Sequence, residues 1–191
     1  CQVNFLAWHE LSDDLRNIPA IANHLRDMRQ SLQGYAAVQV REIHVNEIVG
    51  PDSTHSPAAA LGHLYYLEQG KADAACKACW PDSTGASECF NNSLDGLLAS
   101  VSQPRAAWWV MHAYVSGVAN RVSSQTTDSR VVALGTVAAA NSTAPEVLVG
   151  YFNKSFGIAR LGAATVTIRL EKVSGLQQFS IQMNTAVTAH P

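Results

Sequence analysis

The sequence of 191 residues is long enough for one domain or two small ones, and it can bury a sizeable hydrophobic core. Hydrophobic residues make up 47% of the chain and charged residues 15%, which excludes an intrinsically disordered protein. The formal net charge is −2 and the sequence has neither a basic run nor an apolar run of membrane-spanning length, so nothing favours nucleic-acid binding or a transmembrane helix.

The first predicted unit is a strand followed by a helix. Residues 5–10 form an apolar run that ends on His9 and Glu10, and we expect a strand there. A helix is predicted from about residue 13 to 32, because apolar side chains recur at helical spacing and Gly34 follows them. Pro19 lies early in this helix and predicts a kink or a delayed start.

The rest of the first region is organised around residues 43–52. Alternation along this strand predicts Ile43, Val45 and Glu47 on one face, with His44 and Asn46 on the other. A Gly-Pro-Asp turn follows, so Glu47 comes at the carboxyl end of the strand, where α/β barrels keep their catalytic groups. The alternative is a solvated acid at a strand end, which is the commoner role of such residues.

Spacing predicts the architecture of this region. A helix is expected at 57–70, a strand at 74–80 and a helix at 104–117. The strand ends at Glu10, Glu47 and Trp80 are 37 and 33 residues apart. A (β/α)8 barrel uses about 31 residues for each βα unit. Residues 1–117 are therefore predicted to form three consecutive units of a TIM barrel, whose other strands a partner half must supply.

The pattern changes after residue 117. Short apolar stretches separated by polar turns predict an antiparallel β-sandwich in residues 118–191. The expected strands are 121–123, 130–135, 146–151, 164–170 and 177–183. Trp108 and Trp109, on the helix before this region, are expected to pack against the barrel and the sandwich. The predicted fold is thus α/β plus β, with two domains that meet near residue 118.

Three features favour a secreted, extracellular protein. Asn91, Asn141 and Asn153 each begin a glycosylation acceptor of the form Asn-x-Ser/Thr. Four cysteines accompany them, and lysines are few for the length. The chain starts at Cys1 without an initiator Met or a signal peptide, so we expect a processed or internal piece of a longer precursor.

The cysteines predict a disulfide and no metal site. Cys76 and Cys79 have CxxC spacing, but no second pair follows at the distance of a zinc ribbon. Four cysteines allow three pairings, and we favour Cys79–Cys89, which closes a short polar loop, with Cys1 and Cys76 unassigned. The seven histidines show no ligand cluster, so we predict neither a metal nor a cofactor.

Short motifs in this order resemble one enzyme family. They are Trp8-His9-Glu10, Asn46-Glu47, Ala78-Cys79-Trp80 and the Trp108-Trp109 helix, followed by the predicted sandwich. Together they resemble the C-terminal half of glycoside hydrolase family 39 and its fungal relatives, which include β-xylosidases, α-L-iduronidases and related retaining enzymes. The resemblance spans residues 5–170 and rests on short, moderately specific motifs. It implies that the three strands are barrel strands 6, 7 and 8.

The resemblance also implies chemical roles. The family's strand-7 Glu is the nucleophile, so Glu47 would attack the anomeric carbon and form a glycosyl-enzyme ester. The general acid/base lies on strand 4, which this chain lacks. The N-terminal half of the same barrel, in the same precursor or a second chain, would supply it. The chain alone is therefore expected to be inactive.

Four further residues are candidates for contact with a carbohydrate substrate. Glu10 is interpreted as substrate-contacting or structural, with the general acid/base as the alternative. Trp80 would stack on a sugar face or pack in the core. His9 would hydrogen-bond a sugar hydroxyl or the nucleophile, with a core histidine as the alternative. Trp8, in the same motif, completes this set.

The predicted function is part of a secreted retaining glycoside hydrolase that cleaves plant or microbial polysaccharides or oligosaccharides. Such an enzyme needs two carboxyl groups about 5–5.5 Å apart. The alternative is a non-catalytic carbohydrate-binding or structural β-sandwich module attached to an inactive barrel remnant. A second carboxylate that faces Glu47 would discriminate between the two.

Overall fold

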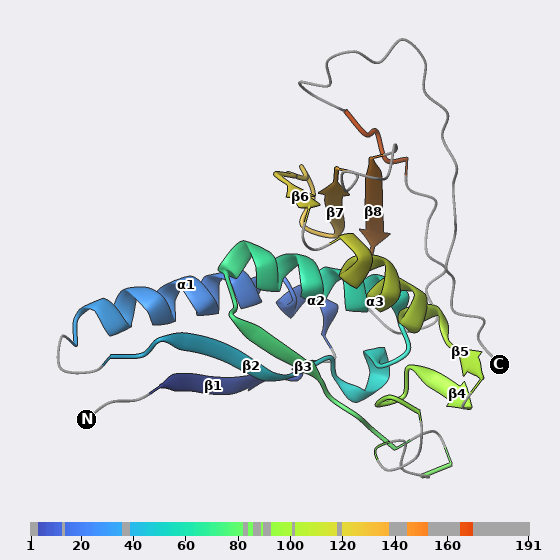
Figure 1. The fold of residues 1–191 in the computed structure, drawn as a ribbon, viewed down its shortest axis with the longest axis horizontal. Helices are drawn as coiled ribbons and strands as arrows, with labels where there is room; N and C mark the ends of the chain where they lie inside the picture. The colour runs from blue at the N-terminus through green and yellow to red at the C-terminus, as the bar shows by residue number, and fades with distance from the viewer. Residues whose placement is uncertain are drawn as a thin grey trace.

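Three layers make up the fold in the computed structural model: a parallel sheet, a layer of helices and an antiparallel sheet (Figure 1). The structure describes residues 4–12, 14–35, 39–81, 84–85, 89, 93–100, 102–117, 120–137, 145–152 and 165–169. The helices lie between the two sheets, and the central helix therefore buries side chains on more than one side.

The parallel sheet contains three strands joined by two helical crossovers. Strands β1 (Phe5–Glu10), β2 (Glu42–Ile48) and β3 (Ala74–Lys77) lie in the order β1-β2-β3. Helix α1 (Ala20–Gln33) joins the first two strands and α2 (Pro57–Gly70) the second two, and both cover the same face of the sheet (Figure 1). The strand predicted at 5–10 and the helix predicted at 57–70 are confirmed with these bounds.

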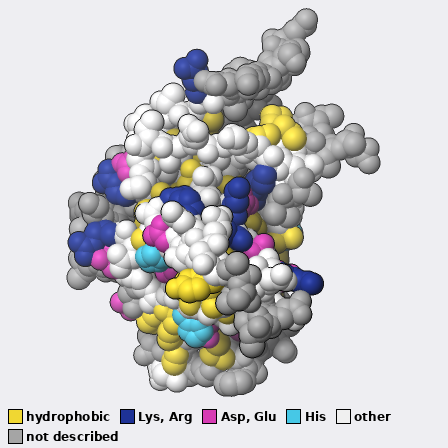
Figure 2. Space-filling view, turned by 90° about the vertical axis from the view of Figure 1, so that its left-hand side faces the viewer, with side chains coloured by type: hydrophobic (Ala, Val, Ile, Leu, Met, Phe, Trp, Pro, Cys, Tyr) yellow, Lys and Arg dark blue, Asp and Glu magenta, His cyan; other side chains and the backbone are white. Residues whose placement is uncertain are grey.

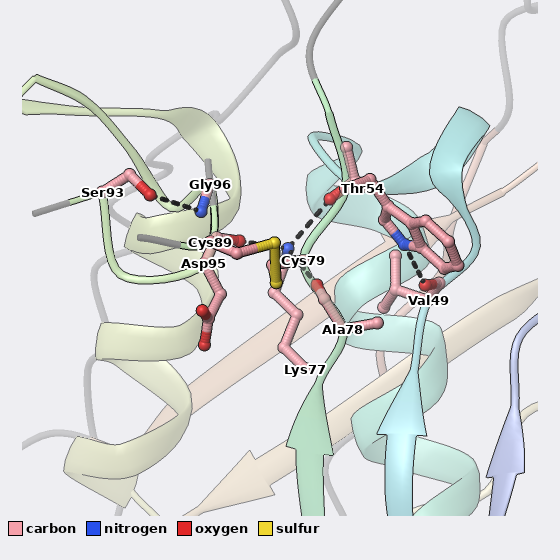
Figure 3. Close-up of a disulfide and its surroundings, with 10 residues drawn as sticks. Val49, Thr54, Lys77, Ala78, Cys79, Cys89, Ser93, Asp95 and Gly96 are labelled. Carbon is pink, nitrogen blue, oxygen red and sulfur yellow. Dashed lines mark hydrogen bonds between the residues drawn. A yellow bond between two sulfur atoms is a disulfide. The ribbon is translucent and has the colours of Figure 1, made fainter. Parts of the chain in front are cut away.

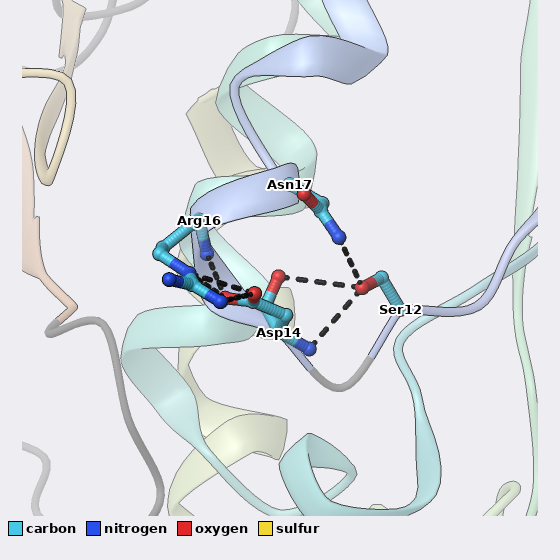
Figure 4. Close-up of polar contacts among 4 residues, drawn as sticks. All are labelled: Ser12, Asp14, Arg16 and Asn17. Atoms are coloured by element: carbon cyan, nitrogen blue, oxygen red, sulfur yellow. Dashed lines mark hydrogen bonds and ion pairs between the residues drawn. The ribbon is translucent and has the colours of Figure 1, made fainter.

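The connection from β1 to α1 begins with a short 3₁₀ helix, η1 (Leu15–Asn17). The Asp14 carboxylate caps it, because it accepts a hydrogen bond from the Arg16 backbone N–H at 3.0 Å and pairs with the Arg16 guanidinium. Ser12 Oγ accepts from the Asp14 N–H at 3.1 Å (Figure 4). Helix α1 starts only after Pro19, which has no N–H to continue an earlier helix. The delayed start is confirmed.

Helix α2 is buried on almost all sides, which explains why its sequence has no polar face. Ten of its fourteen residues are buried. Ser56 caps its first turn by accepting a hydrogen bond from the Ala59 N–H at 3.2 Å. Gly62 allows a neighbour to approach closely: a Cβ at this position would lie 2.8 Å from Cε1 of the Phe152 ring.

The chain after β3 forms a small hairpin, a third helix and an antiparallel sheet. The hairpin strands are β4 (Leu98–Ser100) and β5 (Gln103–Pro104), and the helix is α3 (Ala106–Gly117). The sheet has the order β6-β7-β8, with β6 (Arg121–Val122), β7 (Val131–Thr136) and β8 (Glu146–Tyr151). Residues 165–169, predicted as strand, have no regular secondary structure. The strand predicted at 177–183 lies outside the described residues.

The antiparallel sheet shares its hydrophobic core with the parallel sheet. Val132 and Leu134 of β7 and Phe152 after β8 belong to the same buried cluster as Ile43 and Val45 of β2. Helix α2 connects the two sides, because it contacts both β7 and β8 as well as α1. Burial of these side chains is the main force that holds the layers together.

A largely buried ion pair joins the antiparallel sheet to the helices. Arg121 Nε of β6 donates to Glu68 Oε1 of α2 at 3.0 Å. The guanidinium carbon lies 4.7 Å from the centre of the Tyr114 ring of α3, a cation–π distance. Burial raises the pKa of Tyr114 to about 12, and the nearby Glu68 carboxylate acts in the same direction. The phenol therefore stays neutral.

The predicted partial TIM barrel followed by a β-sandwich is wrong. The parallel strands form an open three-stranded sheet, a hairpin rather than a βα unit precedes α3, and β6-β7-β8 is a single sheet over the helices. The spacing of 37 and 33 residues reflects two βα crossovers, which occur in open sheets as well as in barrels. No second antiparallel sheet faces β6-β7-β8 among the described residues. The domain boundary near residue 118 stays a prediction.

Candidate functional site

Two of the candidate residues meet at the carboxyl end of the parallel sheet. His9 of β1 pairs with Glu47 of β2, and His9 Nδ1 lies 3.4 Å from Glu47 Oε2. Their side chains are 53% and 45% exposed, so a ligand can reach both. Ligands of open parallel sheets bind outside the carboxyl ends of the strands. This pair is therefore the candidate functional site.

A bulge in β2 decides where Glu47 points. The pairing of the two strands passes from Trp8 opposite Val45 to His9 opposite Glu47. Asn46 is therefore an extra residue in β2, as in a β-bulge. Such a residue shifts by one position the alternation of all the side chains that follow it.

The bulge turns Glu47 to the face of the sheet that α1 and α2 do not cover. Ile43 and Val45 of β2 are buried on the covered face, whereas Phe5 of β1 is 53% exposed and its ring stacks on His44. His9 alternates in step with Phe5 and therefore points to the uncovered face. Glu47 contacts His9 and so shares that face. The predicted grouping of Glu47 with the buried Ile43 is wrong, because strict alternation fails where a strand bulges.

Glu10 lies on the opposite face of the sheet from Glu47. It alternates in step with Trp8, whose Nε1 donates to Glu10 Oε1 at 2.7 Å. Nδ1 of His24, on α1, lies 2.9 Å from the same oxygen. The Glu10 side chain is only 14% exposed. The structure thus brings Trp8 and Glu10 together beside α1 and separates them from Glu47.

A buried histidine of α2 lies within electrostatic reach of Glu10. His63 is 1% exposed, and its Nδ1 lies 2.9 Å from the Ala59 carbonyl oxygen. Burial lowers the pKa of His63 to about 4, although the hydrogen bond to Ala59 and the charge of Glu10 act to raise it. His63 is neutral at pH 7 and belongs to the core rather than to the exposed site.

Trp80 contacts the backbone that directly follows β2. Its Nε1 donates to the Val49 carbonyl oxygen at 3.0 Å. Val49 is fully buried and has a φ of +74°, which is rare for a β-branched residue. A backbone strained in this way costs about 1–3 kcal/mol and is found preferentially at functional sites. Trp80 therefore contacts a strained residue two positions after Glu47.

The disulfide predicted between Cys79 and Cys89 is confirmed, with Cα atoms 5.3 Å apart. It holds the segment that carries Trp80 (Figure 3). Lys77, at the end of β3, strengthens the same region, because its Nζ donates to Thr54 Oγ1 at 2.9 Å and to the Asp95 carbonyl oxygen at 2.5 Å. The loops that follow β2 and β3 are thereby linked to each other.

Other candidate positions lie apart from this site. Cys76 of β3 is a free, exposed thiol. The predicted glycosylation positions Asn91, Asn141 and Asn153 lie outside the described residues. In the part of the chain that the structure describes, no group of three or more His, Cys, Asp or Glu could hold a metal ion.

The two tryptophans of α3 differ in exposure. Trp108 is half-buried and stacks on His112, with ring centroids 4.8 Å apart. Trp109 packs edge-on against Trp108, but 53% of it is exposed. Trp109, expected with Trp108 to pack against the barrel and the sandwich, is therefore more exposed than buried.

Two residues that contact or follow the predicted site residues were missed in the sequence, His24 beside Glu10 and Val49 after Glu47. His24 lies in the second turn of α1, and the only signal for it was a histidine in the helix that follows a strand-end acid. No sequence signal marks the positive φ of Val49, because glycine and asparagine are the residues that normally adopt this conformation.

Charged groups are mixed rather than clustered on one face of the molecule. On the face shown in Figure 2, basic side chains lie beside acidic ones and form no large patch of one sign. Arg29 and Asp73, 2.8 Å apart, are one such pair among the described residues. None of the described helices combines the length and the apolar character that a membrane crossing requires.

No protein-family model and no curated protein matches this chain. The resemblance to glycoside hydrolase family 39 therefore rests on the motifs alone, and the site must be judged by its own geometry.

Proposed function

We propose that this chain carries the nucleophile of a retaining glycoside hydrolase and that Glu47 is that nucleophile. The observation that supports this most is the exposed Glu47 carboxylate at the carboxyl end of the central parallel strand, beside His9. Glu47 would attack the anomeric carbon of the sugar, expel the leaving group and form an ester that water then hydrolyses. His9 would orient the carboxylate for this attack.

Hydrolysis with retention of the anomeric configuration requires a second carboxyl group as proton donor, about 5–5.5 Å from the nucleophile. Glu10 does not suit this role, because it lies on the other face of the sheet and is held by Trp8 and His24. We assign the donor to a carboxyl group outside the described residues, in the same precursor or in a second chain. The proposed substrates are plant or microbial polysaccharides or oligosaccharides.

Secretion is part of the same proposal. An intrachain disulfide persists in oxidising compartments and is rare in the cytosol. The glycosylation acceptors at Asn91, Asn141 and Asn153 are consistent with passage through a secretory pathway.

A second candidate function is binding of carbohydrate without catalysis. The separation of Glu10 from Glu47 favours this binding function, since β1 supplies no carboxylate that faces Glu47. In this case the exposed face around Glu47 would hold a sugar through hydrogen bonds, and no bond would be broken.

Substitution of Glu47 by Gln in the full-length protein tests the assignment against a matched control. Glu42 lies on the same strand, also beside a histidine, with Oε2 2.7 Å from His44 Nε2. Glu47→Gln should lower kcat on a panel of aryl glycosides at least about 1000-fold, because the attacking charge is lost. Glu42→Gln, at the other end of β2, should keep wild-type kcat.

Covalent trapping identifies the nucleophile directly. A 2-deoxy-2-fluoro glycoside with a good leaving group should form a stable ester with the wild-type protein, and peptide mapping should place the sugar on the peptide that contains Glu47. A label on any other carboxylate, or full activity of Glu47→Gln, would contradict the proposal. Sugar binding by calorimetry with no turnover and no label would support the binding function instead.

A further inference from the structure

The segment that follows β3 holds the backbone that follows Glu47. The Ala78 N–H donates to the Ile48 carbonyl oxygen at 3.0 Å. The Trp80 indole N–H donates to the Val49 carbonyl oxygen, also at 3.0 Å. The first two carbonyl groups after Glu47 are therefore both fixed from the same side, one by a main-chain donor and one by a side chain.

The second of these carbonyl groups belongs to a strained residue. Val49 has a φ of +74° and is completely buried, and Ile48 before it is 2% exposed. A β-branched residue keeps this conformation only where its surroundings impose it. The Trp80 indole is one such constraint, because it fixes the direction of the Val49 carbonyl. A change in the backbone conformation of Val49 can therefore move Glu47, because only two peptide units separate the two residues.

The segment that carries the Trp80 indole is itself held in place by two contacts. Cys79, between Ala78 and Trp80, is joined to Cys89 by the disulfide (Figure 3). Lys77 binds the same segment to the loop after β2 through Thr54 Oγ1 at 2.9 Å. An indole anchored in this way can resist relaxation of the backbone that it contacts.

We propose that Trp80 is a positioning residue that aims the Glu47 carboxylate through the Val49 carbonyl, rather than a platform for the sugar. The proposal rests on the proposed role of Glu47 as nucleophile. It assigns the indole N–H, and not the face of the ring, as the functional part of Trp80. The disulfide then serves the site by holding the segment that presents this N–H.

The test removes the N–H and keeps an aromatic ring. Trp80→Phe in the full-length protein should lower kcat by about 10- to 100-fold, the effect typical of a displaced catalytic group, with KM within about 2-fold. The rate of inactivation by the fluoro glycoside should fall by the same factor, with the label still on Glu47. Trp109→Phe, on the exposed side of α3, is the matched control and should leave both constants unchanged.

Two outcomes overturn the positioning role. A raised KM with unchanged kcat would make Trp80 a sugar platform, and wild-type values of both constants would leave the N–H without function. If Trp80→Phe does not fold, a benzothiophene analogue of tryptophan at position 80 keeps the shape without the N–H and gives the same test.

A readout without catalysis separates failure of this proposal from failure of the proposed function. If the wild-type full-length protein, tested together with any chain that co-purifies with it, neither turns over substrate nor takes the label, Glu47 is not the nucleophile. The hydrogen bond from the Trp80 indole to the Val49 carbonyl still predicts that Trp80→Phe shifts the backbone amide NMR signals of Glu47 and Val49, whereas Trp109→Phe does not. Unchanged signals would overturn it.

Discussion

Cys79 pairs with Cys89 rather than with Cys76 because the backbone from Cys76 to Cys79 keeps these two residues apart. Cys76 lies in β3, which ends at Lys77, and three residues at the rise of a strand span about 10 Å. A disulfide tolerates Cα separations up to about 7 Å. The Cα atoms of Cys79 and Cys89 are 5.3 Å apart. CxxC spacing on a strand therefore leaves Cys76 free, and the pairing across the polar loop could be predicted from the sequence.

Removal of this disulfide should destabilise the fold measurably. The double substitution Cys79→Ser with Cys89→Ser should lower the free energy of unfolding by about 2–3 kcal/mol, because the unfolded chain regains the entropy of an open loop. Urea titration without reductant measures the change. Cys76→Ser, at the exposed free thiol, should stay within about 0.5 kcal/mol of wild type. Equal stability of the double variant and wild type would contradict the prediction.

At the level of elements, local signals were sufficient where local chemistry decides the boundary. Pro19 delays α1 and α2 starts at Pro57, both as the sequence predicts, and the structure shows that Ser56 caps the first turn of α2. The bulge in β2 could not be predicted in this way. It depends on how β2 pairs with β1, and a pattern within one strand does not contain that register. The face of Glu47 was therefore predicted wrongly although its strand was predicted correctly.

Gly62 tests the contact between α2 and the antiparallel sheet. In an isolated helix, glycine to alanine gains about 1 kcal/mol. Here the new Cβ would lie 2.8 Å from the Phe152 ring, so Gly62→Ala should instead destabilise the protein by about 1–3 kcal/mol through overpacking. Thermal unfolding measures the sign. Adding Phe152→Leu should recover part of the loss, and a stabilised single variant would show that this packing is absent.

At the scale of the whole molecule, the sequence predicted strands and helices but not the number of strands in each sheet. Two crossovers of similar length are compatible with an open sheet or with a barrel, and only the pairing of the outer strands decides between them. The site was predicted in part. His9 and Glu47 meet, but Glu10 does not face them, because adjacent residues of a strand point to opposite faces.

The buried His63 should make the stability of the whole fold depend on pH. Its pKa is about 4 in the folded protein against 6.5 for an ordinary histidine, so the unfolded chain binds more protons between these values. Stability from the neutral imidazole is complete above pH 6.5 and is lost as the pH falls towards 4. Between pH 7.5 and 4.5 the loss should be about 2–3 kcal/mol.

His63→Leu keeps a side chain of similar size in α2 and removes the titrating group. Wild type should therefore lose stability relative to this variant as the pH falls from 7.5 to 4.5. Urea titrations of both proteins at the two pH values measure the change. His112→Gln, at an exposed histidine of α3, should keep the pH dependence of wild type. If the free energies of unfolding of wild type and His63→Leu changed with pH in parallel, His63 would be accessible to protons in the folded state. That result would contradict the burial of His63 between the helices and the sheets.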